Sequence, residues 1–273
     1  MSFKQKISEI QQAKKSVLCV GLDPDPTRLP ASFLPAKSLP DRVLAFNKAI
    51  IEATAPYACA FKLNFAFYEA MGLEGWRVLQ ETVAMLPEDV VSIADAKRGD
   101  IGNSAKFYAK SVYETLGFDS CTVAPYMGRD SFEPFLLYPD KLTFILARTS
   151  NPGAADLQEQ LLEGAPLYEM LTRKIAELPA DQRSRAGLVV GATSPEALAR
   201  IRNIVPGMPF LIPGVGAQGG DEKAVMQASY DGAGSVLINS SRGIIYAGTG
   251  ADFAEAAAEA ARTLQSRLFN AMS

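Results

Sequence analysis

The sequence of 273 residues contains no histidine, a single tryptophan and only three cysteines. Without histidine, the chain has no side chain whose ordinary pKa suits a general base near neutral pH. The cysteines, Cys19, Cys59 and Cys121, lie far apart, and each sits within an apolar run. Their spacing excludes both a cysteine metal site and a disulfide framework, so we expect buried, reduced thiols.

Long apolar runs and basic blocks are also missing. No apolar run approaches the roughly 18 residues needed to cross a bilayer. The opening segment, MSFKQKISEIQQAKK, is polar with a helical period, and it lacks the apolar centre of a signal peptide. The net charge is −3 without a basic stripe, which argues against nucleic acid as the main partner. We therefore expect a soluble, cytoplasmic protein that binds neither a membrane nor nucleic acid.

One unit repeats along the chain: a short apolar run followed by a segment of helical period. The runs are rich in Val, Ile and Leu without strict alternation, which is typical of strands buried on both faces. The segments between them, such as PDRVLAFNKAIIEATA and YEAMGLEGWRVLQETVAML, repeat apolar residues at helical spacing. The eight predicted strands span residues 16–23, 58–64, 90–96, 119–125, 142–148, 186–192, 209–214 and 234–239.

Eight strands that alternate with helices predict a parallel α/β sheet, and eight is the number that closes a (β/α)₈ or TIM barrel. A doubly wound open sheet is the competing arrangement. No low-complexity linker divides the chain, so we expect a single barrel domain over residues 1–273. The longest irregular connection, residues 149–166, is long enough to predict a functional loop.

Polar residues gather where the predicted strands end, which is the edge that carries the active site of a barrel. The third strand runs into DAKRGDIG, in which Asp95, Lys97, Arg98 and Asp100 alternate in sign. Residues two apart on a strand point to one side, so Asp95 and Lys97 should project together. Arg98 should point away, and Asp100 should begin the next helix. A structural ion pair is the plainer explanation, but an exposed pair contributes only about 0–1 kcal/mol.

Two glycine-rich segments, PGVGAQGGD (213–221) and NSSRGIIYAG (239–248), follow the seventh and eighth predicted strands. Barrel enzymes often hold phosphate at these two places, through backbone N–H groups and the start of a short helix. Arg242 would add a bidentate charged contact, and Gln218 a side-chain donor. One such loop could be a flexible connection, but two in the expected places predict phosphate binding.

These motifs follow one another in the order of a known family. DAKRGDIG matches the Asp-x-Lys-x-x-Asp-Ile signature of the orotidine 5′-monophosphate decarboxylases, and the chain resembles that family over nearly its whole length. Its length and the wording KRGDIGNSA are similar to those of the longer bacterial subgroup. The other matching segments are GLDP (21–24), FKLN (61–64), TSNPG (149–153), PGVGAQGG (213–220) and SSRG (240–243).

The resemblance implies an activity without a cofactor: removal of CO₂ from C6 of orotidine 5′-monophosphate, leaving uridine 5′-monophosphate, in de novo pyrimidine biosynthesis. The electrons left on C6 lie in the ring plane, so a fixed ammonium group is the device that stabilises them. By resemblance, Lys97 takes that role and then protonates C6. Asp95 would lie near the substrate carboxylate and strain the ground state. Lys62 and Asp100 would complete a row, Lys62–Asp95–Lys97–Asp100, that keeps Lys97 protonated.

The resemblance also implies how the nucleoside is held. Asp23 and Lys62 match residues that hold the ribose hydroxyls. Ser150 matches a serine that reads the pyrimidine edge, and Pro213 would line the pocket near the base.

The remaining implied contacts concern the phosphate and a second chain. Gln218 and Arg242 match the phosphate grip, with the backbone of Gly243 beside them. Asp100 and Ser104 match residues that reach into the site of the neighbouring subunit. The resemblance therefore implies a homodimer with shared active sites.

Two other functions remain compatible with the pattern. A sugar-phosphate decarboxylase or aldolase of a related barrel family would use the same carboxylates to hold Mg²⁺. A non-catalytic phosphate-binding barrel would need the two phosphate loops but not the pair of Asp95 and Lys97. The segments TSNPG and PGVGAQGG favour the nucleotide decarboxylase, and no metal is expected.

Overall fold

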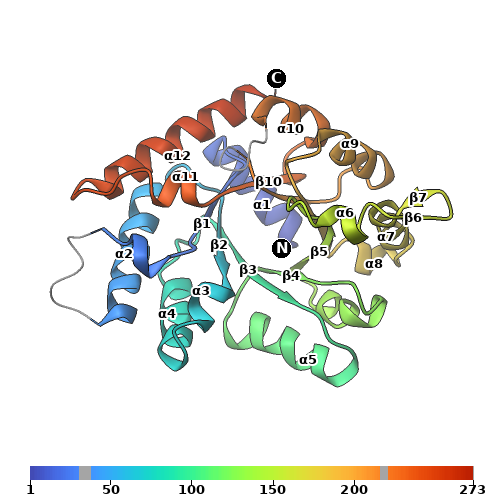
Figure 1. The fold of residues 1–273 in the computed structure, drawn as a ribbon, viewed down its shortest axis with the longest axis horizontal. Helices are drawn as coiled ribbons and strands as arrows, with labels where there is room; N and C mark the ends of the chain where they lie inside the picture. Colours follow the sequence, from blue (N-terminus) through green and yellow to red (C-terminus); the bar gives the residue numbers. More distant parts are fainter. Residues whose placement is uncertain (31–37, 216–220, 273) are drawn as a thin grey trace.

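Eight parallel strands close into a barrel in the computed structural model, which describes residues 1–30, 38–215 and 221–272 (Figure 1). The order around the barrel is β1-β10-β9-β8-β5-β4-β3-β2, so each predicted strand pairs with its neighbours in the chain. The competing prediction of a doubly wound open sheet is therefore wrong. The barrel strands are β1 (Leu18–Gly21), β2 (Ala60–Asn64), β3 (Val91–Arg98), β4 (Ser120–Val123), β5 (Leu142–Arg148), β8 (Ala186–Val190), β9 (Phe210–Pro213) and β10 (Val236–Ser240).

Helices surround the barrel and alternate with its strands (Figure 1). None of those in the described part of the chain is long and apolar enough to cross a membrane. The α-helices are α1 (Phe3–Lys14), α2 (Leu39–Thr54), α3 (Phe65–Glu69), α4 (Leu73–Ala84), α5 (Gly102–Lys110), α6 (Ala154–Leu157), α7 (Leu167–Ala176), α8 (Ala180–Arg183), α9 (Pro195–Ile204), α10 (Glu222–Ser229), α11 (Arg242–Ile245) and α12 (Phe253–Asn270).

Helix α2 illustrates why these segments fold as they do. The Ser38 side chain accepts the N–H of Asp41 and so caps the first turn. Val43, Phe46 and Ile50 recur at helical spacing and form part of its buried face. The same spacing was expected to continue through residues 68–86, but there the structure has two helices, α3 and α4.

The break between α3 and α4 occurs at Gly72, whose φ is +65°. A residue in this left-handed conformation cannot continue a right-handed helix, and glycine adopts it at little cost. Helix α3 follows β2 directly, so its residues stay close to the carboxyl end of the barrel.

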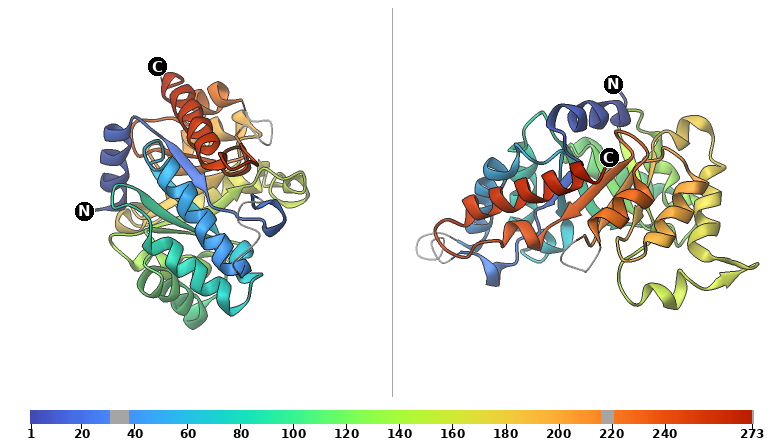
Figure 2. Two further views of the ribbon diagram at one scale, coloured as in Figure 1. Left: turned by 90° about the vertical axis from the view of Figure 1, so that its left-hand side faces the viewer. Right: turned by 90° about the horizontal axis from the view of Figure 1, so that it is seen from above.

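Helix α1 covers the amino-terminal end of the barrel. Phe3 and Ile7 join a buried cluster with barrel residues such as Val91 and Phe144. The Gln11 side chain donates to the carbonyl of Val236 at 2.7 Å, which ties the helix to the start of β10. In the right-hand view of Figure 2, α1 lies at one end of the barrel and the β6–β7 hairpin extends toward the other.

The long connection after β5 has structure of its own. It contains α6 and a two-stranded antiparallel hairpin of β6 (Leu161–Leu162) and β7 (Ala165–Pro166). The hairpin turn places Glu163 and Gly164 at φ values of 54° and 84°. The hairpin projects from the barrel beside α6 (Figure 1).

The three cysteines are unpaired and fully buried, as expected. Burial raises the pKa of the Cys59 thiol to about 12 and also raises the pKa of Cys19 and Cys121. Removal from water disfavours the thiolate, so these groups pack as small apolar side chains.

Candidate active site

A cavity of about 580 Å³ opens where the barrel strands reach their carboxyl ends. Barrel enzymes carry their active sites at this end. The cavity's apolar floor includes Val189 and Leu211, which belong to the same buried cluster as the residues of α1, and Leu146, which packs against that cluster. Its rim is polar, and the sequence-predicted residues that line it are Asp23, Lys62, Asp95, Lys97, Ser150, Pro213 and Arg242.

Strand β3 is distorted where it enters the cavity. Its register with β4 shifts between Ala94 and Arg98, and Lys97 within this bulge has a φ of +47°. A residue other than glycine rarely adopts this left-handed backbone conformation, because its Cβ comes too close to the following carbonyl oxygen. Even so, Lys97 Nζ lies 2.7 Å from Asp95 Oδ1. The two side chains do project together as predicted, although simple alternation along a strand is not what brings them there.

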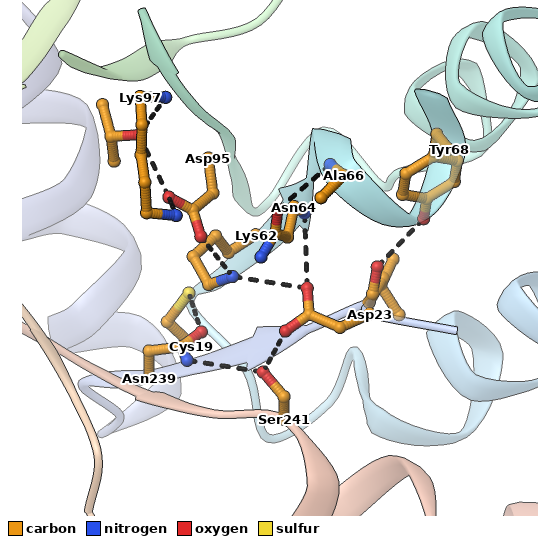
Figure 3. A network of polar contacts seen from close by, with 12 residues as sticks. Cys19, Asp23, Lys62, Asn64, Ala66, Tyr68, Asp95, Lys97, Asn239 and Ser241 are labelled. Carbon is orange, nitrogen blue, oxygen red and sulfur yellow. Dashed lines mark hydrogen bonds and ion pairs between the residues drawn. The ribbon is translucent and has the colours of Figure 1, made fainter. Parts of the chain in front are cut away.

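Four charged side chains form a continuous row across the cavity (Figure 3). Lys62 Nζ lies 3.3 Å from Asp23 Oδ1 and 3.0 Å from Asp95 Oδ2, and Lys97 contacts the other oxygen of Asp95. The exposed fraction of the side chain is 5% for Lys62 and 11% for Asp95, but 48% for Lys97. The row therefore runs from the barrel interior to one ammonium group that is open to the cavity.

The lysines determine the ionisation of the buried acid. Burial alone would raise the pKa of Asp95, but the charges of Lys62 and Lys97 outweigh it and hold that pKa well below its usual range. Burial would lower the pKa of Lys62, yet Asp23 and Asp95 raise it above its ordinary value. Asp95 and Lys62 consequently both remain charged near neutral pH.

Asp23 is held on both of its oxygens. The Ser241 hydroxyl donates to Asp23 Oδ2 at 2.7 Å, and the backbone N–H of Asn64 donates to Oδ1 at 3.3 Å (Figure 3). A Cβ at Gly21 would lie 1.9 Å from Ser241 Oγ, so only glycine leaves room for this contact. Sequence reasoning missed Ser241, although it lies within the SSRG segment.

The residues predicted to bind phosphate lie in different places. Arg242 begins α11 and lines the cavity, whereas Gly243 lines a neighbouring hollow together with Val215. Gln218 lies outside the described residues. Arg28, which sequence reasoning did not single out, also lines the cavity, and its guanidinium carbon lies 4.0 Å from the centre of the Tyr246 ring.

Asp100 and Ser104 do not line this cavity. They lie in a separate hollow of about 500 Å³ whose walls include Phe107. Asp100 Oδ1 accepts the N–H of Ile101 at 2.7 Å, and no ion pair joins it to Lys97 within the described part of this chain. Helix α5 begins at Gly102 with Ile101 as its N-cap, so the expectation that Asp100 begins this helix is wrong.

Arg98 points away from the cavity, as predicted. Its guanidinium forms an ion pair with Glu69 of α3 and lies 5.4 Å from the ring centres of both Phe65 and Tyr108. These contacts anchor the end of the bulge to α3 and α5. Arg98 thus fixes the backbone that carries Lys97 without reaching into the cavity.

Among the residues that the structure describes, no group of three or more Asp, Glu, Cys or His side chains is placed to hold a metal ion. The carboxylates of Asp23 and Asp95 have other partners: Asp23 accepts from Lys62 and Ser241, and Asp95 accepts from Lys62 and Lys97. The cavity is thus arranged to present an ammonium group beside a carboxylate.

Residues 16–259 match the Orotidine 5'-phosphate decarboxylase / HUMPS family. The chain belongs to this family. It is 48% identical over 270 residues to an orotidine 5'-phosphate decarboxylase of Dehalococcoides mccartyi, covering 97% of this chain and 96% of that one. A protein of the same name from Herpetosiphon aurantiacus is 47% identical and covers 95% of each chain. The resemblance seen in the motifs is confirmed.

Solved structures of this family share the barrel. The OMP decarboxylase of Leishmania donovani is similar with a TM-score of 0.83 and 41% identity, covering 98% of this chain and all of that one. The chain spans 57% of the longer UMP synthase of the same organism. A decarboxylase of Methanocaldococcus jannaschii, solved with the inhibitor BMP, has 20% identity and a TM-score of 0.64, which shows the shared fold. The names of these relatives favour neither the sugar-phosphate enzyme nor the non-catalytic barrel.

Proposed function

We propose that this chain is a carboxy-lyase that converts orotidine 5′-monophosphate to uridine 5′-monophosphate in de novo pyrimidine biosynthesis. The observation that carries the proposal is the ammonium of Lys97, open to the cavity and held 2.7 Å from the buried carboxylate of Asp95. Family membership supplies the substrate, and the cavity supplies a fixed positive charge at the end of a barrel.

The reaction breaks the bond between C6 and the substrate carboxylate. CO₂ leaves, and the electron pair remains on C6 in the plane of the ring, where a π-electron sink cannot accept it. The Lys97 ammonium stabilises this charge, which exists only near the transition state. A proton then passes from Lys97 Nζ to C6 and completes the product, and Lys97 regains a proton from solvent. Asp95 would lie beside the departing carboxylate.

We propose that no cofactor takes part. Lys97 can supply both the charge and the proton, and the carboxylates of Asp23 and Asp95 are engaged by ammonium and hydroxyl groups. Turnover should survive exhaustive chelation. A requirement for Mg²⁺, or trapping of a substrate imine on Lys97 by borohydride, would instead indicate a sugar-phosphate type of chemistry.

The other residues of the rim are assigned to the nucleotide. Asp23 and Lys62 would bind the ribose hydroxyls, because they present a carboxylate and an ammonium side by side. Ser150 would read the pyrimidine edge, and Pro213 would pack near the base, since both line the same cavity.

Arg242 would bind the phosphate, because it lines the cavity after the last barrel strand, where related folds hold anions. Gln218 and the backbone of Gly243 complete the proposed grip. Arg28 adds a further positive charge to the lining of the cavity.

We also propose a homodimer with shared active sites. Asp100 and Ser104 lie on a surface that exposes the apolar side chains Ile101 and Phe107, which a second copy of the chain would cover. Asp100 would then face Lys97 of the partner and complete the row of alternating charges. Sedimentation of the native protein tests the dimer. The unpaired, buried cysteines fit a reducing compartment, and we place the protein in the cytoplasm.

The activity is tested by adding orotidine 5′-monophosphate to chelator-treated protein and following the loss of its ultraviolet absorbance. We expect turnover that yields one uridine 5′-monophosphate per substrate consumed. Unchanged absorbance with native, folded protein would contradict the proposal.

A further inference from the structure

A buried threonine on the neighbouring strand contacts both members of the reactive pair. Thr122 of β4 has no exposed surface. Its hydroxyl donates to Asp95 Oδ1 at 3.0 Å, and its oxygen accepts the backbone N–H of Lys97 at 3.0 Å. One side-chain oxygen therefore joins the carboxylate of one residue to the backbone of the other.

We infer that Thr122 is a positioning residue that fixes Lys97 and Asp95 in the geometry needed for decarboxylation. The inference rests on the function proposed above. Thr122 does not itself line the cavity, so it acts through the two lining residues that it holds, Asp95 and Lys97.

The bulge in β3 explains why a hydroxyl is needed at this position. The register of β3 and β4 is interrupted between Ala94 and Arg98, so the N–H of Lys97 lies outside the regular ladder and donates to a side chain instead. The left-handed conformation of Lys97 is unfavourable and persists only where its surroundings hold it. The hydrogen bond from Lys97 N–H to Thr122 is one such restraint.

The second hydrogen bond orients the carboxylate. Asp95 Oδ1 accepts from both Thr122 Oγ1 and Lys97 Nζ, while Oδ2 accepts from Lys62. Rotation of this carboxylate would move the acceptor that holds the Lys97 ammonium. A group that donates to Asp95 and accepts from Lys97 with one atom must be a hydroxyl, and the branched Cβ of threonine restricts its rotation.

The test compares Thr122→Val, which keeps the shape and removes both hydrogen bonds, with Thr122→Ser, which keeps the hydroxyl. We expect Thr122→Val to lower kcat by about 10- to 100-fold, while KM and the affinity for uridine 5′-monophosphate change by less than about threefold. Thr122→Ser should restore kcat to within about threefold of the native enzyme. A merely structural role would not lower kcat while leaving KM nearly unchanged.

Thr143→Val is the matched control. Thr143 is a buried threonine of the adjacent strand β5, and its hydroxyl lies 3.1 Å from Tyr113 Oη, with no hydrogen bond to the reactive pair. The control should lose stability without losing kcat. If Thr122→Val does not fold, Thr122→Ala and Thr122→Ser give the same comparison, because they differ by a single oxygen.

The inference is overturned if removal of the hydroxyl leaves kcat within about threefold of native, or if Thr143→Val lowers kcat as much as Thr122→Val. It is also overturned if serine fails to restore the rate. These outcomes are distinct from a failure of the proposed function, in which the native protein itself would leave orotidine 5′-monophosphate unchanged.

Discussion

Replacing Lys97 by alanine should abolish decarboxylation and leave the fold intact. Loss of one preorganised hydrogen-bond donor typically lowers kcat by about 100- to 1,000-fold, and Lys97 is assigned both the charge and the proton, so we expect at least about 1,000-fold. Asp95 keeps Lys62 at 3.0 Å and Thr122 at 3.0 Å after the change. Because the Lys97 side chain is 48% exposed, the lost ion pair should cost only about 0–1 kcal/mol of the unfolding free energy.

Comparing Lys97→Gly with Lys97→Ala separates the effect of the lost charge from the effect of backbone strain. At a φ of +47°, a residue with a Cβ costs about 1–2 kcal/mol relative to glycine, and glycine loses about 0.5–1 kcal/mol more through the entropy of the unfolded chain. The free energy of unfolding of Lys97→Gly should therefore exceed that of Lys97→Ala by about 1 kcal/mol, which corresponds to a Tm higher by about 1–3 °C. Both variants should be inactive.

The assay measures kcat from the loss of substrate absorbance, nucleotide affinity from calorimetry and Tm from thermal unfolding. Lys48→Ala is the control, because Lys48 forms an exposed pair with Glu52 on α2, away from the cavity. More than about 1% of native kcat in Lys97→Ala would refute the role of the lysine. A glycine variant less stable than the alanine variant would refute the explanation of the strain.

Three further predictions concern the phosphate, the dimer and acid stability. Arg242→Ala should weaken product binding and also lower kcat at saturating substrate, because the proposed contact with phosphate would order the site; an effect on KM alone in steady-state kinetics would contradict this. Co-expressed Lys97→Ala and Asp100→Asn chains should recover about one quarter of native activity through mixed dimers, whereas isolated mixed dimers without a gain would exclude shared sites. Asp95 has a lowered pKa in the fold, so its stabilisation is complete above the unfolded pKa and is lost as pH falls from about 5 toward 1. In denaturant titrations over that pH range, the unfolding free energy of Asp95→Asn should fall less than that of the native protein. An equal dependence of the unfolding free energy on pH in the two proteins would contradict the pairing of Asp95 with the lysines.

The barrel was predictable because its strands are buried on both faces. Runs such as residues 186–192 are apolar without alternation, and the eight runs alternate with segments whose apolar residues recur at helical spacing. Helix boundaries were less predictable, because they depend on backbone conformation. Gly72 and Gly102 both have positive φ, which divides one helix and delays the start of α5 beyond Asp100.

The candidate site was predictable where charge stands out against an apolar strand. Asp95 and Lys97 gave that signal, and the structure brings them together. Thr122 and Ser241 gave none, because a hydroxyl on a strand is common and its partners lie far away in sequence. The bulge that places Lys97 arises from the pairing of β3 with β4, which no local pattern encodes.

The most direct test of the central claim is decarboxylation in D₂O by chelator-treated enzyme, with the product analysed by NMR. A carbanion at C6 that is quenched by an exchangeable proton of Lys97 predicts uridine 5′-monophosphate with deuterium at C6, formed in equal amount to the CO₂ released. The Lys97→Ala protein should bind the nucleotide and form no labelled product. Product that forms only after Mg²⁺ is restored, or labelled product at the native rate from Lys97→Ala, would contradict the claim.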